Sequence, residues 1–282
     1  MQKVLEVIGL SKKYGDHVVL DNINFDLEEG SILGIIGKSG CGKTTLLNTI
    51  VGFLQSDTGK ITYKGKDVTR SNTPLKKTIG FAVQEGSFYK KLSVRENLHY
   101  FGRLYGLSSA DIKHRTDTLI HTFGLTEASH VLGENLSVGM QKRLDIACAL
   151  IHDPEILILD EPTANLDPVL RKNIMELIKH INNSGTSVMI SSHILEDIRN
   201  LCNKVLIIHN KKAVAFDTPE NLESNFSNHK LVKIESELKE YTNLVNLLHN
   251  YGLVKKHYTN ENELMVFTKD VKSTLKLINN FL

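Results

Sequence analysis

The hydrophobic pattern of this chain is dominated by short apolar runs of a length typical of buried strands. One run covers Ile32–Ile36, a second covers 156–159 and a third covers 187–190. The second run continues without alternation, which is typical of a central strand buried on both faces of a parallel sheet. The first run has the pattern of a buried strand and the third that of another apolar strand. Between 156 and 216 such strands alternate with helical patterns, as a parallel sheet requires. The pattern therefore predicts an α/β fold with a parallel-sheet core.

Two other patterns precede and interrupt this sheet. Residues 1–35 and 59–83 are predicted to form strands with short turns, which gives an antiparallel β region. From Gly86 to about Ala149 the spacing of apolar residues becomes helical, and Ser93-x-x-Glu96 is a capping box near its start. We therefore expect a helical subdomain over about 86–149, ending in a helix over 141–151.

The composition changes after residue 217, where Asn, Lys and Glu become frequent. Residues 230–235 and 263–268 have strand patterns, while the segments around 241–248 and 271–282 have helical patterns. The sequence thus predicts a main domain over 1–217 and a small α+β appendage over 218–282. The role of this appendage stays open between regulation, dimer support and passive packing.

A glycine-rich segment follows the first apolar run and fits the pattern G-x-x-x-x-G-K-[ST] between a strand and a helix. Its backbone N–H groups and the positive end of the following helix dipole favour phosphate oxygens. The lysine of the pattern reaches the β- and γ-phosphates, and the following threonine hydroxyl holds Mg²⁺. We expect a nucleoside triphosphate to be bound here by Gly37, Lys38, Ser39, Gly40, Cys41, Gly42, Lys43, Thr44 and Thr45.

Two carboxylates, Asp160 and Glu161, end the second apolar run. Ligands of parallel sheets bind at the carboxyl ends of the strands, so both acids are expected beside the nucleotide. Asp160 is suited to orient Mg²⁺ through its water shell. Glu161 is suited to polarise an attacking water or to take its proton. Taken alone, the pair could equally be strand-end acids that face solvent, but the phosphate loop favours the catalytic interpretation.

With these motifs in place, residues 1–217 closely resemble the ATP-binding subunit of an ATP-binding-cassette (ABC) transporter. Further matches occur in the order typical of that family: Tyr14, Gln84, the signature segment with Ser137 and Gly139, Asp167 and His193. The resemblance implies that Tyr14 stacks on adenine and that Gln84 contacts both Mg²⁺ and the attacking water. It further implies that His193 contacts the γ-phosphate and that Asp167 belongs to a loop at a dimer interface. The implied fold is a P-loop NTPase ABC cassette.

The signature segment departs from the usual Leu-Ser-Gly-Gly-Gln of the family. Val138 replaces the first glycine and Met140 replaces the glutamine, with Gln141 one place later. Ser137 and Gly139 keep a hydroxyl and an unhindered backbone N–H for an anion, and the following helix aims its positive end at the same place. The substitutions affect whatever contact the usual glutamine makes. This form resembles bacterial antibiotic and peptide exporters of the bacitracin-resistance type.

The resemblance also implies partners and a location. Two copies of the chain would form a head-to-tail homodimer with two ATP molecules between them, in which Ser137 and Gly139 of one copy close over the γ-phosphate held by Lys43 of the other. An integral membrane permease subunit would contact the surface near 86–98. The chain would then be peripheral at the cytoplasmic face of a bacterial cell membrane.

Composition limits the possible partners and the cellular compartment of the chain. A chain of 282 residues with 41% hydrophobic content can bury a large core, and a net charge of +2 gives no reason to expect a nucleic-acid partner. Three cysteines without metal-ligand spacing suit a reducing cytosol, and no run reaches the roughly 18 apolar residues of a membrane-spanning helix.

The phosphate loop is compatible with three classes of function: an ATPase subunit of an exporter, a non-transport ABC ATPase acting on ribosomes or DNA, and a P-loop kinase. Ribosome-acting relatives usually carry two cassettes, and DNA-repair relatives insert a long coiled coil between the phosphate loop and the acid strand. A kinase would not need Ser137, Gly139 and Glu161 together. The exporter subunit is favoured, with a non-transport ABC ATPase as the alternative; the ATPase motifs alone leave import open.

Overall fold

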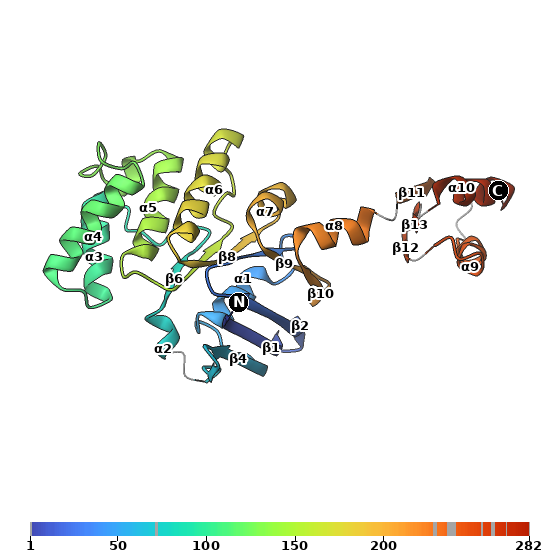
Figure 1. Cartoon of the computed structure of the whole chain (residues 1–282), viewed down its shortest axis with the longest axis horizontal. Coiled ribbons are helices and arrows are strands. Elements are labelled where there is room, and N and C mark those ends of the chain that lie inside the picture. Colours follow the sequence, from blue (N-terminus) through green and yellow to red (C-terminus); the bar gives the residue numbers. More distant parts are fainter. Residues whose placement is uncertain are drawn as a thin grey trace. The chain divides into compact units, whose positions relative to one another are not determined.

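The central sheet of the first part of the chain is parallel, apart from one edge strand, and has the order β10-β9-β3-β8-β7-β6 (Figure 1). Every residue of β3, β7 and β8 is buried, which confirms that the three apolar runs are strands and that the second is buried on both faces. The strands are β3 (Ile32–Ile36), β6 (Ile79–Ala82), β7 (Ile156–Asp160), β8 (Ser187–Ser192), β9 (Lys204–His209) and β10 (Lys212–Asp217).

The structure is a computed structural model that describes residues 2–70, 73–227, 230–235, 241–254, 256–260, 263–268 and 270–281. The chain divides into two compact units, Met1–Thr218 and Pro219–Leu282.

A second sheet in the first unit is antiparallel and has the order β2-β1-β4-β5. Its strands are β1 (Lys3–Tyr14), β2 (His17–Glu28), β4 (Thr58–Tyr63) and β5 (Lys66–Asp67). The predicted antiparallel region over 1–35 and 59–83 was therefore too wide, because β3 and β6 belong to the parallel sheet and the short helix α2 (Thr73–Lys76) precedes β6. The reason is burial: β3 and β6 are buried almost throughout, whereas β2 alternates buried and accessible residues.

Helix α1 (Lys43–Ile50) belongs to the core that joins the two sheets. Its buried Leu46, Leu47 and Ile50 form one hydrophobic cluster with residues of β1, β2, β3 and β7. The helix begins at Lys43, directly after Gly42, which takes the left-handed conformation at the N-cap with φ +107°. The phosphate loop is thus fixed between a buried strand and a buried helix.

The stretch over 86–149 is helical, as predicted. It contains α3 (Val94–Leu104), α4 (Ser109–Thr122), a short 3₁₀ turn at Gly133–Asn135 and α5 (Val138–Leu150), gathered at one side of the first unit (Figure 1). The capping box is confirmed: Glu96 N donates to Ser93 Oγ at 3.3 Å, and Ser93 N donates to Glu96 Oε2 at 2.8 Å. Helix α5 begins three residues before the predicted position, because the Ser137 hydroxyl caps it.

Two more helices complete the connections of the parallel sheet. Helix α6 (Pro168–Asn183) joins β7 to β8, and α7 (Leu195–Leu201) joins β8 to β9. Helix α7 packs very closely on β3, because a Cβ placed on Gly34 would lie 2.4 Å from Ile198 Cγ2 and 2.9 Å from Cys202 Sγ. Only glycine fits at this position of β3.

The second unit is an α+β arrangement around its own small core. Its antiparallel sheet has the order β11-β13-β12, and Leu244, Leu248, Leu264, Val266 and Ile278 are buried together. The predicted strands and helices in this region are confirmed, with Leu282 outside the described residues, but α8 and β12 were not predicted. The elements are α8 (Pro219–Ser227), β11 (Lys230–Glu235), α9 (Thr242–Asn250), β12 (Lys256–Asn260), β13 (Glu263–Thr268) and α10 (Val271–Phe281).

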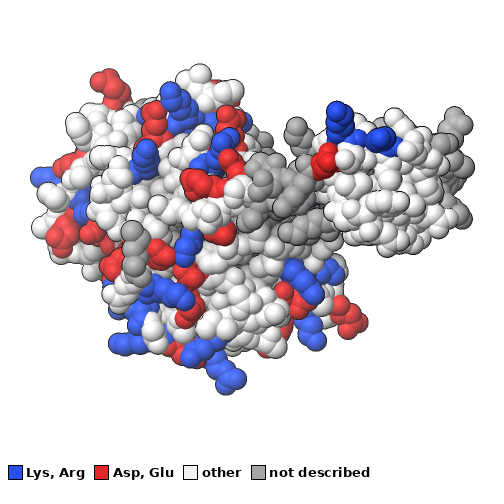
Figure 2. Space-filling model, turned by 45° about the vertical axis from the view of Figure 1, so that its right-hand side comes forward, with Lys and Arg blue, Asp and Glu red and all other residues white. Residues whose placement is uncertain are grey.

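Positive and negative side chains are interspersed over the visible face of the first unit (Figure 2). Within the described parts of the chain, no helix has both the length and the hydrophobicity that crossing a membrane demands.

Candidate nucleotide site

The loop between β3 and α1 has a backbone shape that depends on its glycines. A Cβ on Gly37 would lie 2.3 Å from Cys41 Sγ and 2.7 Å from the carbonyl oxygen of Ile208 on β9. Gly40 and Gly42 both have left-handed backbones, with φ +77° and +107°. Lys43 is buried, and its Nζ closes the loop by donating to the Gly37 carbonyl at 2.8 Å and to the Lys38 carbonyl at 3.4 Å. The loop is a concave run of backbone around a lysine, as a phosphate site requires.

The two acids at the end of β7 are buried despite their charge: Asp160 is 2% exposed and Glu161 is 7% exposed. Ser191, opposite Asp160 in the neighbouring strand β8, contacts both. Its hydroxyl donates to Asp160 Oδ1 at 2.6 Å and accepts from Glu161 N at 2.9 Å. Glu161 itself has a left-handed backbone with φ +50°, which turns the chain sharply at the strand end. Ser191 therefore holds the Asp160 carboxylate and the backbone of Glu161.

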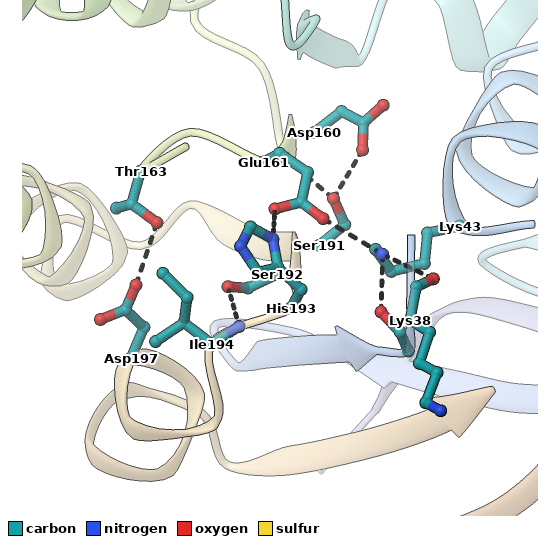
Figure 3. Close-up of polar contacts among 11 residues, drawn as sticks. Lys38, Lys43, Asp160, Glu161, Thr163, Ser191, Ser192, His193, Ile194 and Asp197 are labelled. Atoms are coloured by element: carbon teal, nitrogen blue, oxygen red, sulfur yellow. Dashed lines mark hydrogen bonds and ion pairs between the residues drawn. The ribbon is translucent and has the colours of Figure 1, made fainter. Parts of the chain in front are cut away.

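Glu161 lies between Lys43 and His193, from three separate parts of the sequence (Figure 3). Its Oε1 is 3.1 Å from Lys43 Nζ, and its Oε2 is 2.7 Å from His193 Nδ1. Lys43 and Glu161 are both buried, so each compensates the charge of the other, whereas about half of the His193 side chain is exposed. Three of the residues predicted to act on the γ-phosphate and the water are thus in contact.

The other residues predicted to bind the nucleotide are exposed or partly buried. They lie in the loop after β3, in the first turn of α1, at the end of β1 and after β6. Thr44 is exposed in the first turn of α1, Cys41 and Thr45 are partly buried, and Lys38, Ser39 and Gly40 are exposed at the loop tip. Tyr14 is 50% exposed at the end of β1, with Lys12 Nζ 5.6 Å from the centre of its ring. Gln84 is exposed after β6, and its carbonyl oxygen accepts from Lys142 Nζ.

The signature residues lie at the start of α5. Ser137 is exposed and its hydroxyl accepts from Met140 N at 3.3 Å, while Gly139 is buried against Leu170 of α6. The displaced Gln141 has a structural task, because its amide donates to the carbonyls of Gly133 and Leu136 at 3.0 and 3.2 Å. Gln141 therefore holds the turn before α5.

Asp167 is exposed and caps the N-terminus of α6. Its Oδ1 accepts from Val169 N at 2.9 Å and from Leu170 N at 3.0 Å.

Sequence reasoning missed several residues that organise the site. Ser191 is one of them, and the available signal was a hydroxyl at the polar end of an apolar strand. Thr163, which follows the acid pair, donates to Asp197 Oδ2 at 3.0 Å and so ties that turn to α7 (Figure 3). A pairing between residues so far apart in sequence leaves no local pattern.

Comparison with known proteins relates the chain to one family. The model of the family described as "ABC transporter" matches residues 20–164. The linearmycin resistance ATP-binding protein LnrL of Bacillus subtilis is 34% identical over 82% of this chain and 74% of that protein. The Nod factor export ATP-binding protein I of Cupriavidus metallidurans is 35% identical over 79% of this chain and 73% of that protein.

Solved structures agree with these relatives. A structure described as the ATP binding subunit of an ABC transporter is 27% identical, covers 79% of this chain and 93% of its own, and superposes with a TM-score of 0.71. The structure of cbiO1 from Clostridium perfringens, part of the ABC transporter complex cbiONQ, is 26% identical over 89% of this chain and 98% of its own, with a TM-score of 0.74. The chain therefore belongs to the ABC transporter family as an ATP-binding subunit, an ATPase whose hydrolysis of ATP powers transport across a membrane.

Proposed function

We propose that Glu161 is the general base of ATP hydrolysis in this subunit and that the subunit drives export through an integral membrane permease. The observation that carries the proposal is the contact of Glu161 with both Lys43 and His193 at the end of β7. In this arrangement a carboxylate lies beside the lysine that attracts the γ-phosphate, which is where a water must be activated. His193 then donates to the γ-phosphate or orients the water.

Binding of the nucleotide is assigned to the loop after β3 and to Tyr14. The backbone N–H groups over 37–45 and the N-terminus of α1 would hold the phosphates, because both present positive partial charge. Lys43 would exchange its contacts with the carbonyls of Gly37 and Lys38 for phosphate oxygens. Tyr14, with an accessible ring at the end of β1, would stack on adenine.

The residues assigned to Mg²⁺ are Thr44, Gln84 and Asp160. All three side chains offer hard oxygen ligands, which suit Mg²⁺, and the Asp160 carboxylate is oriented by its hydrogen bond from Ser191. Bound Mg²⁺ would neutralise charge that develops on the phosphates during hydrolysis.

The signature residues are assigned to a second copy of the chain. In a head-to-tail homodimer, Ser137 and Gly139 of one copy would close over the γ-phosphate held by Lys43 of the other, with Asp167 at the interface. The exposed Ser137 hydroxyl and the N-terminus of α5 favour an anion at this point. ATP would then stabilise the closed pair, and hydrolysis would release it.

Export rather than import is favoured by the relatives, whose names state linearmycin resistance and Nod factor export. The permease is assigned to the surface near 86–98, where the loop that follows Gln84 meets α3. In this proposal the subunit lies at the cytoplasmic face of a bacterial cell membrane, held there by its permease.

The test separates ATP binding from its hydrolysis. Glu161→Gln keeps the size of the side chain but removes the base, so hydrolysis should fall about 10²–10⁴-fold. ATP binding should persist, and the variant should accumulate as an ATP-bound dimer in gel filtration. Asp160→Asn should instead weaken Mg²⁺-dependent ATP binding as well as turnover.

Glu176→Gln on the exposed face of α6 is the matched control and should hydrolyse ATP normally. Near-normal single-turnover hydrolysis by Glu161→Gln would remove this residue from the base role and leave Gln84 and His193 to handle the water.

A further inference from the structure

The loop that carries Gln84 is tied to helix α5 at two points. Lys142 Nζ donates to the carbonyl oxygen of Gln84 at 2.7 Å, and Ser87 N donates to Asp145 Oδ1 at 2.5 Å. Both anchoring side chains belong to α5 and lie three residues apart, so they share one face of that helix. The loop segment from Gln84 to Ser87 is therefore expected to move together with α5.

The far end of the same loop is anchored to α3. Asn97 is fully buried, accepts from Tyr89 N at 2.7 Å and donates to the Tyr89 carbonyl at 3.0 Å. Residues 84–89 are thus held at both ends by side chains of the helical subdomain, although the strand β6 that leads into them belongs to the parallel sheet. The loop is the place where a displacement of the helices would reach Gln84.

The bond from Ser87 N to α5 is made to a buried carboxylate, whereas the bond from Lys142 to Gln84 is exposed. Asp145 is 2% exposed, and burial raises the pKa of its carboxyl to about 6, while burial lowers the pKa of the Lys142 ammonium. Gly86 has a left-handed backbone with φ +87°, and a Cβ there would lie 3.2 Å from Phe88 of the same loop and 3.9 Å from Asp145 Oδ1 of α5. The loop therefore passes close to the helix. A hydrogen bond to a carboxylate that is buried in this way is costly to break.

Helix α5 also begins at the signature segment. Ser137 caps it and Gly139 lies in its first turn, so the Lys142 anchor follows Gly139 by one helical turn. A helix of this length moves as a rigid element. A displacement that Ser137 and Gly139 undergo at their end of α5 is consequently passed to Gln84.

We propose that Lys142 and Asp145 are positioning residues that couple the two ATP sites of the dimer, by linking closure of Ser137 and Gly139 on one ATP to the placement of Gln84 at the other. The proposal rests on the ATP-bridged dimer of the proposed function. By linkage the coupling is reciprocal, so ATP at either site favours the closed state of both. Hydrolysis should then depend cooperatively on ATP concentration.

Matched substitutions distinguish the anchoring bonds from general packing. Lys142→Met keeps the apolar stem and removes the donor, whereas Lys142→Arg keeps a donor. Asp145→Leu removes the acceptor for Ser87 N, whereas Asp145→Asn keeps an amide oxygen that can accept the same bond. Both conservative variants should behave like the unmodified chain.

The experiment measures steady-state ATP hydrolysis by the full-length chain over a range of ATP concentrations, together with equilibrium ATP binding. We expect a Hill coefficient above 1 for the unmodified chain and for Lys142→Arg and Asp145→Asn. We expect a value near 1 and roughly tenfold slower turnover for Lys142→Met and Asp145→Leu, with ATP affinity of each site changed less than about twofold.

Two outcomes would overturn the coupling: an unchanged Hill coefficient in Lys142→Met and Asp145→Leu, or a Hill coefficient of 1 in an unmodified chain that still dimerises with ATP. Absence of any ATP-induced dimer in sedimentation would instead count against the proposed sandwich. The two failures are thus separate. If Asp145→Leu does not fold, Lys142→Met decides the matter alone.

Discussion

Lys43 Nζ lies 3.1 Å from Glu161 Oε1, and both side chains are almost completely buried. The lysine that would receive the phosphate is therefore already paired with the carboxylate that would activate the water. An incoming γ-phosphate competes with the Glu161 carboxylate for Lys43. Binding of the nucleotide would therefore free Glu161, the proposed base, from its ion pair with Lys43.

The first prediction concerns the strength of this pair without nucleotide. Lys43→Met leaves the Glu161 carboxylate buried without its lysine partner, and should lower the free energy of unfolding by on the order of 3 kcal/mol. The double variant Lys43→Met/Glu161→Gln should recover most of that loss, because it buries no uncompensated charge. Urea unfolding of the two single variants and the double variant measures the coupling.

The exposed pair Lys172–Glu176 is the control, and Lys172→Met should change stability by less than about 0.5 kcal/mol. Strictly additive effects of Lys43→Met and Glu161→Gln would contradict a buried interacting pair.

The second prediction separates packing from anion recognition at Gly139. A Cβ there would lie 2.9 Å from Leu170 Cδ2, so Gly139→Asp and Gly139→Asn should cost similar stability. Only the aspartate adds a negative charge where a γ-phosphate is expected. ATP-dependent dimerisation, followed by sedimentation, should be at least about tenfold weaker for Asp than for Asn. Equal dimerisation of the two variants would limit Gly139 to a packing role against α6.

The third prediction concerns Tyr14. Stacking of an aromatic ring on a base contributes about 1–3 kcal/mol and does not depend strongly on base identity. Tyr14→Ala should therefore weaken ATP and GTP binding alike, by roughly ten- to a hundredfold, and Tyr14→Phe should be near normal. Calorimetric titration with each nucleotide measures both. Unchanged affinity in Tyr14→Ala would make this residue an ordinary surface tyrosine.

The fourth prediction is a pair of opposite pH effects on stability. Burial lowers the pKa of His152 from 6.5 to about 4, where its ring stacks on Tyr105 and its Nε2 is 3.1 Å from the Ile79 carbonyl. Between these values the unfolded chain binds more protons than the folded chain, so His152 makes stability fall as the pH falls from 6.5 to 4. Burial raises the pKa of Asp145 from 3.8 to about 6, so in that window the folded chain binds more protons and stability falls as the pH rises.

Denaturant unfolding from pH 4 to pH 7 measures both effects as differences from the unmodified chain. His152→Gln should remove the loss of stability on acidification, whereas Asp145→Asn should remove the loss on raising the pH. If the free energy of unfolding changed with pH in the same way for the two variants, these assignments would be contradicted.

The parts of the site that follow from local sequence were predictable. Lys43, Asp160 and His193 each follow an apolar strand or its glycine-rich turn, and ends of parallel strands meet at one edge of the sheet. Ser191, Lys142 and Asp145 were not predicted as parts of the site, because their contacts depend on strand register and on a loop crossing a helix. These contacts form only once the strands and helices have packed together, so no local sequence pattern indicates them.

The same distinction explains the errors in the fold. The capping box at Ser93 and the buried runs of β3 and β7 are local patterns, and they were predicted. The assignment of β3 and β6 to a sheet depends on their partners, which the strand pattern alone does not name. Strand β12 was missed because its sequence, KHYTN, has no alternating apolar residues.

The close contact of Gly34 with Ile198 and Cys202 has a consequence for genetics. Helix α7 begins just after His193, so any side chain at Gly34 must push that helix away from the sheet and carry the histidine with it. A random screen for loss-of-function alleles should therefore recover substitutions at Gly34 with the phenotype of a damaged His193. The allele would map to the middle of a buried strand, and second-site suppressors would be expected among smaller residues at position 198.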